Sequence, residues 1–290
     1  MKKRLVCALF ALVFLLVVLP LPALAESEVQ PLSPFASASA LKDFKVTNGK
    51  RVSVDLDGDG KKDSISYKDN ENADGYIKIT FTKTKKTWKY TLKADDFYRN
   101  PGRTLHNKLR TVVFKNASGN RVFAFMTPAV GNGGDADAFG LLVFVLKNGK
   151  MTQQKLTPPT FTAKFSADGT TFTFRGEDTG SNQKLYVNRE FGNKYADLPL
   201  WTDFYTDFQC VKSNSGGYNL MLGMKMYGEN RVDSLGVAYT VFKVDGKGKL
   251  KAAAQAFMPD LSAGTDPGIF VDAPSAGAAA ELLDKLIASN

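Results

Sequence analysis

The sequence predicts an all-β fold made of several small antiparallel sheets. Short stretches rich in Val, Ile, Thr, Tyr and Phe alternate apolar and polar residues, as half-buried strands do. Turns containing Gly, Asn and Asp separate these stretches. Groups of such strands recur at roughly 40–55 residues, a spacing typical of propeller blades. We therefore expect a propeller-like arrangement, with a β-sandwich as the alternative, and one C-terminal helix.

Residues 1–25 have the pattern of a signal peptide. A basic stretch from Lys2 to Arg4 precedes an apolar run from Leu5 to Leu19, and Ala23-Leu24-Ala25 matches the small-x-small motif of a cleavage site. We expect cleavage near Ala25 and secretion, to the extracellular space or the periplasm. The sequence contains no second long apolar run, so we expect a mature form that does not span a membrane.

Charge and cysteine content narrow the classes of partner. The net charge of the chain is +9, and it falls to +6 without residues 1–25, which contain three basic residues and no acidic ones. The charges are scattered, which does not fit a nucleic-acid-binding surface. An anionic cell envelope suits a secreted basic protein. Cys210 is the only cysteine outside the leader, where Cys7 lies, so no internal disulfide is expected.

The mature chain is divided into a short arm and a long β domain. Residues 26–42 contain much Ser, Ala and Pro without a period, and we expect a flexible linker there. The β domain is expected over residues 43–274. Its strands are expected at 51–54, 64–68, 76–82 and 87–92 in a first unit; 109–115, 122–126 and 141–146 in a second; and 161–165, 172–174 and 184–190 in a third. A fourth unit is expected to begin near Phe204, with strands at 220–226, 235–244 and 251–258.

The C-terminal segment has a different pattern. Residues 275–290 are rich in Ala and place four aliphatic residues on one helical stripe. These residues are Leu282, Leu283, Leu286 and Ile287. The stripe predicts an amphipathic helix.

The segment from Asp55 to Asp63 has the composition of a calcium loop. Carboxylates recur at alternate positions, and Gly60 permits a sharp turn. Four such carboxylates in so short a loop would repel one another without a cation. An EF-hand is excluded, because position 12 is Ser66 and both flanks are strand-like. The expected calcium ligands are the carboxylates of Asp55, Asp57, Asp59 and Asp63 and the backbone carbonyl of Lys61.

The stretch from Val54 to Ile65, VDLDGDGKKDSI, resembles the DxDxDGxxD calcium loop of FG-GAP/VCBS-type repeats in secreted bacterial proteins. The resemblance covers about a dozen residues and is specific for the metal loop. It implies that the loop joins two strands and that calcium is the bound ion. It implies a structural role for calcium, since no helix pair flanks the loop.

Other candidate residues give weaker signals. The loop from Gly131 to Asp137 has two alternating carboxylates, fewer than a calcium site needs, and we interpret it as a plain loop. His106 is the only histidine, and no Gly-x-Ser-x-Gly motif accompanies it. Core packing is the favoured role of a set of aromatic residues that would otherwise form a sugar-stacking surface. These are Trp88, Tyr90, Trp201, Phe204 and Tyr205.

The function expected from these patterns is that of a secreted calcium-binding β-protein. We favour a non-enzymatic binding or cell-envelope-associated module, whose partner is cell-wall or extracellular polysaccharide or protein. The alternative is an extracellular hydrolase of glycan or peptide, with carboxylates that meet only in the fold. Its candidates are Asp95, Asp96, Glu177, Asp178, Glu190, Asp203 and Asp207.

Overall fold

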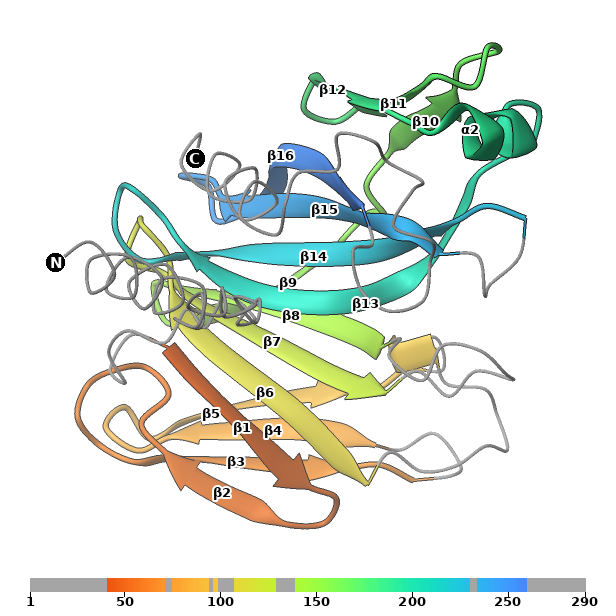
Figure 1. The fold of residues 1–290 in the computed structure, drawn as a ribbon. Helices are drawn as coiled ribbons and strands as arrows, with labels where there is room; N and C mark the ends of the chain where they lie inside the picture. Colours follow the sequence, from red (N-terminus) through yellow and green to blue (C-terminus); the bar gives the residue numbers. More distant parts are fainter. Residues whose placement is uncertain are drawn as a thin grey trace, which may run out of the picture. The chain divides into compact units, whose positions relative to one another are not determined.

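The computed structural model describes residues 41–70, 75–93, 96–98, 107–128, 139–229 and 234–259 (Figure 1). These residues form sixteen strands in four antiparallel sheets, one short α-helix and one 3₁₀ turn at Asp96–Tyr98. The predicted all-β class with several small antiparallel sheets is confirmed. The expected signal peptide, the Gly131–Asp137 loop, His106 and the helix over 275–290 lie outside the described residues.

The first sheet is a simple meander that carries the acidic loop. Its strands follow chain order, with antiparallel neighbours throughout. They are β2 (Arg51–Val54), β3 (Asp63–Lys68), β4 (Tyr76–Phe81) and β5 (Lys86–Thr91). In β3 and β4 alternate side chains are buried, which is the period of a sheet with one covered face. All four strands match the expected positions closely.

The second sheet joins β1 (Leu41–Thr47) to a distant meander. Its order is β1-β6-β7-β8-β9, and the register runs from Leu41 opposite Phe114 to Thr47 opposite Lys108. The other strands are β6 (Lys108–Lys115), β7 (Arg121–Pro128), β8 (Phe139–Lys147) and β9 (Lys150–Gln154). The chain thus builds the whole first sheet between β1 and β6. Residues 41 and 42, expected in the linker, are strand residues because they pair with β6.

The third sheet contains β10 (Phe161–Phe165), β11 (Thr171–Gly176) and β12 (Ser181–Tyr186). The strand expected over 184–190 is wrong beyond Tyr186, since helix α2 (Arg189–Tyr195) begins there. Asn188 stops the strand because its side chain caps the helix and accepts a hydrogen bond from the Glu190 N–H at 3.0 Å.

In the described part of the chain, no helix is long and apolar enough to cross a membrane.

The fourth sheet contains the longest strands. They are β13 (Trp201–Lys212), β14 (Tyr218–Tyr227), β15 (Ser234–Val244) and β16 (Leu250–Pro259). The expected unit began only near Phe204, but β13 begins at Trp201. Register shifts between Thr202 and Tyr205 and between Tyr205 and Asp207 interrupt the alternation there. Irregular pairing therefore hid the start of this strand from the sequence pattern.

The second sheet is covered on both faces. From one face of β7, Phe123 and Phe125 pack in a core with residues of the first sheet, such as Ile79. From the opposite face, Val122 and Ala124 join a second core with residues of the fourth sheet, such as Leu220. Each fully buried aromatic or aliphatic side chain of this kind contributes about 1.5–3 kcal/mol. Hydrophobic burial on two sides therefore fixes the sheet that supports the acidic loop.

The third sheet packs against the fourth through β16. The Gln183 side-chain amide donates to the Phe257 carbonyl at 3.0 Å and accepts from the Phe257 N–H at 3.0 Å. Nearby, the Ser181 hydroxyl accepts from the Gln255 N–H at 3.3 Å. A further hydrophobic core with Phe172 and Phe257 lies beneath these contacts. Side chains of β12 therefore bond backbone groups on the free edge of β16, where a further strand would otherwise add.

Candidate metal centre

The acidic loop occupies the connection between β2 and β3. The ladder of these strands closes with Val54 opposite Asp63, so the two ends of the loop are held together by backbone pairing. Gly58 and Gly60 adopt φ of 78° and 86°, a region that side chains other than Gly strongly disfavour. Two glycines at these points let the chain curl, so that successive carboxylates face the interior of the loop. The predicted strand–loop–strand arrangement is thus observed.

Three of the four predicted carboxylates meet in space. Ligand oxygens of Asp55, Asp57 and Asp63 all lie within 4.8 Å of one another. Asp55 and Asp57 are partly buried, whereas Asp63 is completely buried, with 0% of its surface exposed. Such a cluster of hard oxygen ligands can hold a metal ion, and carboxylate donors suit Ca²⁺, Mg²⁺ or Mn²⁺.

Asp63 is the fixed point of the cluster. Its Oδ2 accepts a hydrogen bond from the Leu56 N–H at 2.9 Å, and its Oδ1 accepts from the Thr82 N–H at 2.8 Å. Thr82 directly follows β4, so the buried carboxylate joins the loop to the end of the neighbouring strand. In addition, the Thr82 hydroxyl donates to the Lys62 carbonyl at 2.6 Å. Because both carboxylate oxygens are anchored, Asp63 presents its remaining lone pairs in a fixed direction.

Asp55 lies where backbone donors favour its charge. Its Oδ1 accepts from the Gly58 N–H at 2.7 Å, its Oδ2 accepts from the Gly60 N–H at 3.3 Å, and the Lys42 ammonium is 3.8 Å from Oδ2. Burial acts to raise the pKa of Asp55, but these donors and the Lys42 charge outweigh it and hold that pKa below its ordinary value. Asp55 is therefore ionised under ordinary conditions.

Asp57 lies in the opposite environment. Burial raises its pKa, and the neighbouring carboxylates of Asp63 and Asp59 raise it further. The Asp59 N–H, which donates to Asp57 Oδ1 at 3.2 Å, offsets only part of this effect. Without a cation, the charge of Asp57 is disfavoured in the folded loop. A bound metal ion would reverse that preference, since it supplies positive charge to the same oxygens.

Asp59 lies beside the three clustered carboxylates and is not one of them. Its Oδ1 accepts from the Lys61 N–H at 2.8 Å. Its Oδ2 is buried and has no hydrogen-bond partner among the described residues. A buried carboxylate oxygen without a partner is costly, so this atom is a natural further ligand. Lys61, predicted to contribute its carbonyl, lies in the same loop with an exposed side chain.

Besides Lys42, whose ammonium lies near Asp55, two further residues at the loop were not anticipated from the sequence, Thr82 and Arg121. Arg121, the first residue of β7, donates from Nε to the Asp57 carbonyl at 3.1 Å. Its guanidinium also lies against Gly58, where any side chain would collide with it. Both residues approach from strands remote in sequence, and no local motif marks them. Arg121 thus fixes the loop to the second sheet, as Thr82 fixes it to the first.

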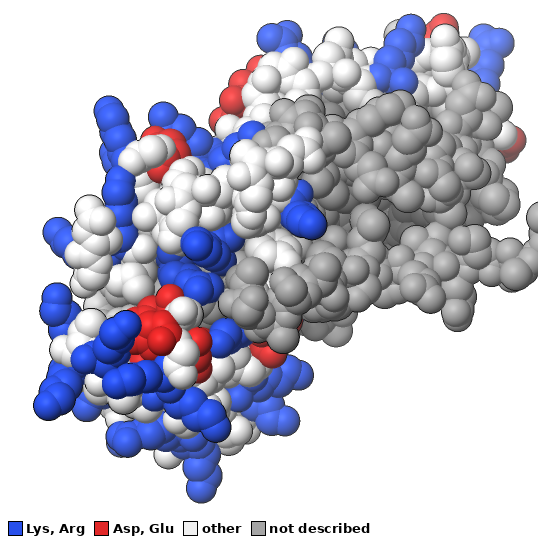
Figure 2. Space-filling model, turned by 90° about the vertical axis from the view of Figure 1, so that its left-hand side faces the viewer, with Lys and Arg blue, Asp and Glu red and all other residues white. Residues whose placement is uncertain are grey.

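Figure 2 shows how acidic and basic side chains are distributed on one face of the protein. There, a compact acidic group is surrounded by Lys and Arg side chains.

Comparison with models of protein families, with characterised proteins and with solved structures found no match to this chain. The resemblance of residues 54–65 to the FG-GAP/VCBS-type loop therefore stays a prediction.

Most of the aromatic candidates pack inside the protein. Trp88 and Tyr90 contact Phe144 edge-on, with ring centroids 4.8 Å and 5.0 Å away. Trp201 stacks on Tyr227 at 4.7 Å. Tyr205 is buried in the core between the second and fourth sheets. The predicted core role is confirmed for Tyr205, whereas Trp88 and Tyr90 are half-buried and pack against the core. Trp201 is also half-buried, and the side chain of Phe204 is not described.

Several candidate carboxylates of a hydrolase have local partners. Glu177 pairs with Arg175 at 3.6 Å. Asp178 accepts from the Thr160 N–H at 2.6 Å. Asp207 accepts from the Tyr239 hydroxyl at 2.7 Å. These contacts are typical of turns and of paired strands. Residue Asp95 and the side chain of Asp203 are not described.

Proposed function

We propose that this chain is a secreted β-protein whose β2–β3 loop binds one structural calcium ion, and that it serves as a non-enzymatic binding or cell-envelope-associated module. The observation that carries the metal site is the meeting of Asp55, Asp57 and Asp63 beside a buried Asp59 oxygen without a described partner. The signal-peptide pattern of residues 1–25 supports export.

Calcium is the ion that suits this loop best. It takes six to eight oxygens in flexible geometry, whereas Mg²⁺ demands a near-ideal octahedron and retains several waters. The loop offers four carboxylates within nine residues. The resemblance of residues 54–65 to a known calcium loop supports the same choice.

The ion would stabilise the first sheet. The loop joins β2 to β3, and Asp63 also bonds Thr82 after β4, so one ion would hold the ends of three strands. Outside the leader the chain has a single cysteine, Cys210, which is buried and free. An exported chain without an internal disulfide gains from another covalent-like constraint, and a metal clip supplies one.

The test of the metal site is thermal unfolding of the secreted chain in millimolar calcium and in chelator. At a calcium concentration about a hundredfold above Kd, the ion should raise Tm by about 5–10 °C. Asp57→Ala and Asp59→Ala should abolish this response. Asp168→Ala, which removes an aspartate from a different turn, should retain it. Identical melting of the wild type in both buffers would refute the site.

The binding role is tested by retention on envelope material. We expect the purified chain to be retained on isolated cell walls or on an extracellular polysaccharide, and to be released by salt, since its charge is positive. Absence of retention on every such material would refute the envelope proposal and leave the metal proposal intact. The hydrolase alternative gains no support from the described pocket between β5 and β9, whose lining contains no carboxylate.

A further inference from the structure

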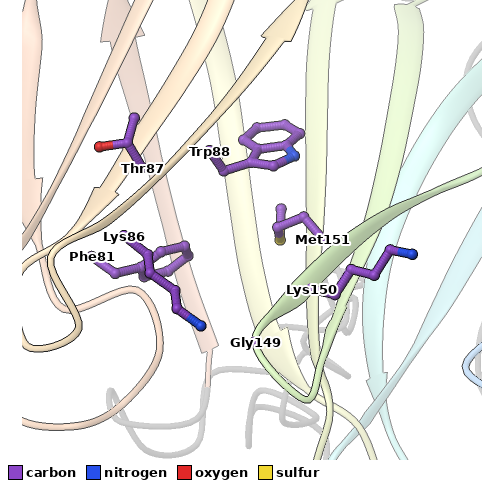
Figure 3. A pocket seen from close by; sticks show the side chains of 7 residues that line it. All are labelled: Phe81, Lys86, Thr87, Trp88, Gly149, Lys150 and Met151. Atoms are coloured by element: carbon purple, nitrogen blue, oxygen red, sulfur yellow. The ribbon is translucent and has the colours of Figure 1, made fainter.

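A pocket of about 320 Å³ lies between the edge strand of the first sheet and a hairpin of the second (Figure 3). One wall comes from β4 and β5, and the other comes from the turn between β8 and β9. The lining residues are Phe81, Lys86, Thr87, Trp88, Gly149, Lys150 and Met151. Among the described strands, both β5 and β9 are edge strands, so the pocket lies at the edges of the two sheets.

Trp88 provides a rigid aromatic surface in this pocket. Its ring is held by Phe144 edge-on at 4.8 Å and by Tyr90 and Phe125 in stacked orientation at 6.2 Å and 6.4 Å. The side chain is only partly buried, and the remainder faces the pocket toward Met151 (Figure 3). A ring held in place by three others loses little further freedom when a ligand stacks on it. The core packing of Trp88 and a binding role are therefore compatible.

Two ammonium groups give the pocket its charge. Lys86 extends across the gap toward the opposite hairpin, and its Nζ lies 3.6 Å from where a Cβ on Gly149 would be. Lys150 follows that turn, with its amine directed outward along the rim in Figure 3. Neither ammonium forms an ion pair with another described residue. The pocket thus combines an aromatic surface with positive charge that no described acidic residue pairs with.

We propose that this pocket binds an acidic saccharide, such as a uronic-acid unit of a polysaccharide. The apolar C–H face of a pyranose ring would stack on Trp88, whose π face is negative. The sugar carboxylate would pair with the Lys86 ammonium, a charge-assisted contact, and Lys150 would add longer-range attraction. This inference rests on the proposed binding function and names the class of partner.

The pocket and the metal loop are connected by two consecutive residues, Phe81 and Thr82. Phe81 lines the pocket, and the next residue, Thr82, donates its N–H to Asp63. Phe81 also pairs with Lys86 across the β4–β5 ladder. An ion bound at Asp63 would therefore steady the strand ends that carry Phe81 and Lys86. The binding site and the metal site are separate, but the order of one supports the geometry of the other.

The test is a titration of the secreted chain, in millimolar calcium, with three probes. These are digalacturonate, its neutral counterpart digalactose, and sodium acetate. The two tryptophan indole N–H signals in NMR report binding, with the Trp88 signal assigned by Trp88→Phe. We expect digalacturonate to shift the Trp88 signal, and the Trp201 signal to stay in place. Digalactose should bind at least about tenfold more weakly, and acetate should not move the signal.

Charge variants separate the pocket from general electrostatics. Lys86→Gln should weaken digalacturonate binding about tenfold without changing Tm, because this side chain is exposed. Lys164→Gln, which removes the same charge from exposed β10 outside the pocket lining, should leave binding unchanged. Equal binding of the neutral sugar, an equal shift by acetate, equal weakening by both variants, or no binding of digalacturonate would each overturn the proposal.

The same preparations distinguish failure of this inference from failure of the metal proposal. If chelator does not lower Tm but digalacturonate still shifts the Trp88 signal, the metal proposal fails and the pocket stands. If chelator lowers Tm and no saccharide binds, the reverse holds.

Discussion

The acidic loop between β2 and β3 and the turn between β10 and β11 both contain aspartates, but the two places have opposite effects on the charge of a carboxylate. In the turn, Asp168 Oδ1 accepts from the Ser166 hydroxyl at 2.5 Å, the Thr170 hydroxyl at 2.8 Å and the Thr170 N–H at 3.1 Å. These donors lower the pKa of Asp168 to about 2. In the loop, burial and neighbouring carboxylates raise the pKa of Asp57.

The contrast shows what distinguishes a metal loop from an ordinary acidic turn. Asp168 is one carboxylate among several donors, so its charge is satisfied locally and no cation is needed. The loop has four carboxylates, and its Asp59 Oδ2 is buried without a described partner. Four carboxylates lie close together there, and a bound cation would offset their mutual repulsion.

The largest effect should come from Asp63→Ala. This change removes a proposed metal ligand, leaves the buried N–H of Leu56 without its acceptor and removes the acceptor of the Thr82 N–H. We expect a loss of about 2–4 kcal/mol of unfolding free energy even in chelator, together with loss of the calcium response. Denaturant titration in both buffers measures each part. A variant as stable as the wild type in chelator would contradict the anchoring role of Asp63.

Asp57→Asn should have effects of opposite sign in the two buffers. In calcium the variant should melt below the wild type, because a charged ligand is lost. In chelator it should melt above the wild type, because the repulsion that raises the pKa of Asp57 is removed. Calorimetry with and without calcium tests this reversal. A decrease of Tm in both conditions would show that Asp57 is not strained by its neighbours.

Asp168→Asn should give a smaller loss of stability that is the same in calcium and in chelator. The amide oxygen still accepts hydrogen bonds, but the charge that strengthens them is gone. Thermal melts of this variant in both buffers provide the measurement. Any calcium dependence beyond that of the wild type would break the proposed contrast between the turn and the loop.

The smallest effect concerns pH. Since the pKa of Asp168 in the folded chain is about 2, below the ordinary aspartate value of 3.8, its contribution to stability is present above about 3.8 and is lost as pH falls toward 2. NMR titration of the Asp168 carboxyl should give a pKa near 2, and Ser166→Ala should raise it. A titration near 3.8 in the wild type would contradict the hydrogen bonds of the turn.

The strands and the metal loop were largely predictable from local sequence. Alternation identified the first sheet, and carboxylate spacing identified the loop, because both signals lie within a few neighbouring residues. Pairing of β1 with β6 was not predictable, since Leu41 and Phe114 are brought together only after a whole sheet has formed between them. Helix α2 was missed because the sequence before it has a strand-like pattern. The change to helix depends on the side chain of Asn188, which caps the first turn.

The candidate site was predictable as a ligand set but not as a supported structure. Thr82, which follows β4, contacts the loop through its backbone N–H, and Arg121 of β7 contacts it through its side-chain Nε. Neither contact is marked by a motif near the loop in sequence. Asp59 has the same spacing as the clustered carboxylates but lies beside them, and its Oδ1 accepts from the Lys61 N–H. Sequence spacing predicts which carboxylates could be metal ligands, whereas the distances between them depend on tertiary contacts.

The Gln183 amide that bonds Phe257 has a consequence for self-association. An open edge strand is a template on which another copy of a chain can add by backbone pairing. Here a side-chain amide occupies the donor and acceptor of Phe257. Any incoming strand must first displace the third sheet from β16. We therefore expect the contact between these two sheets to hinder pairing of another copy with β16 at Phe257.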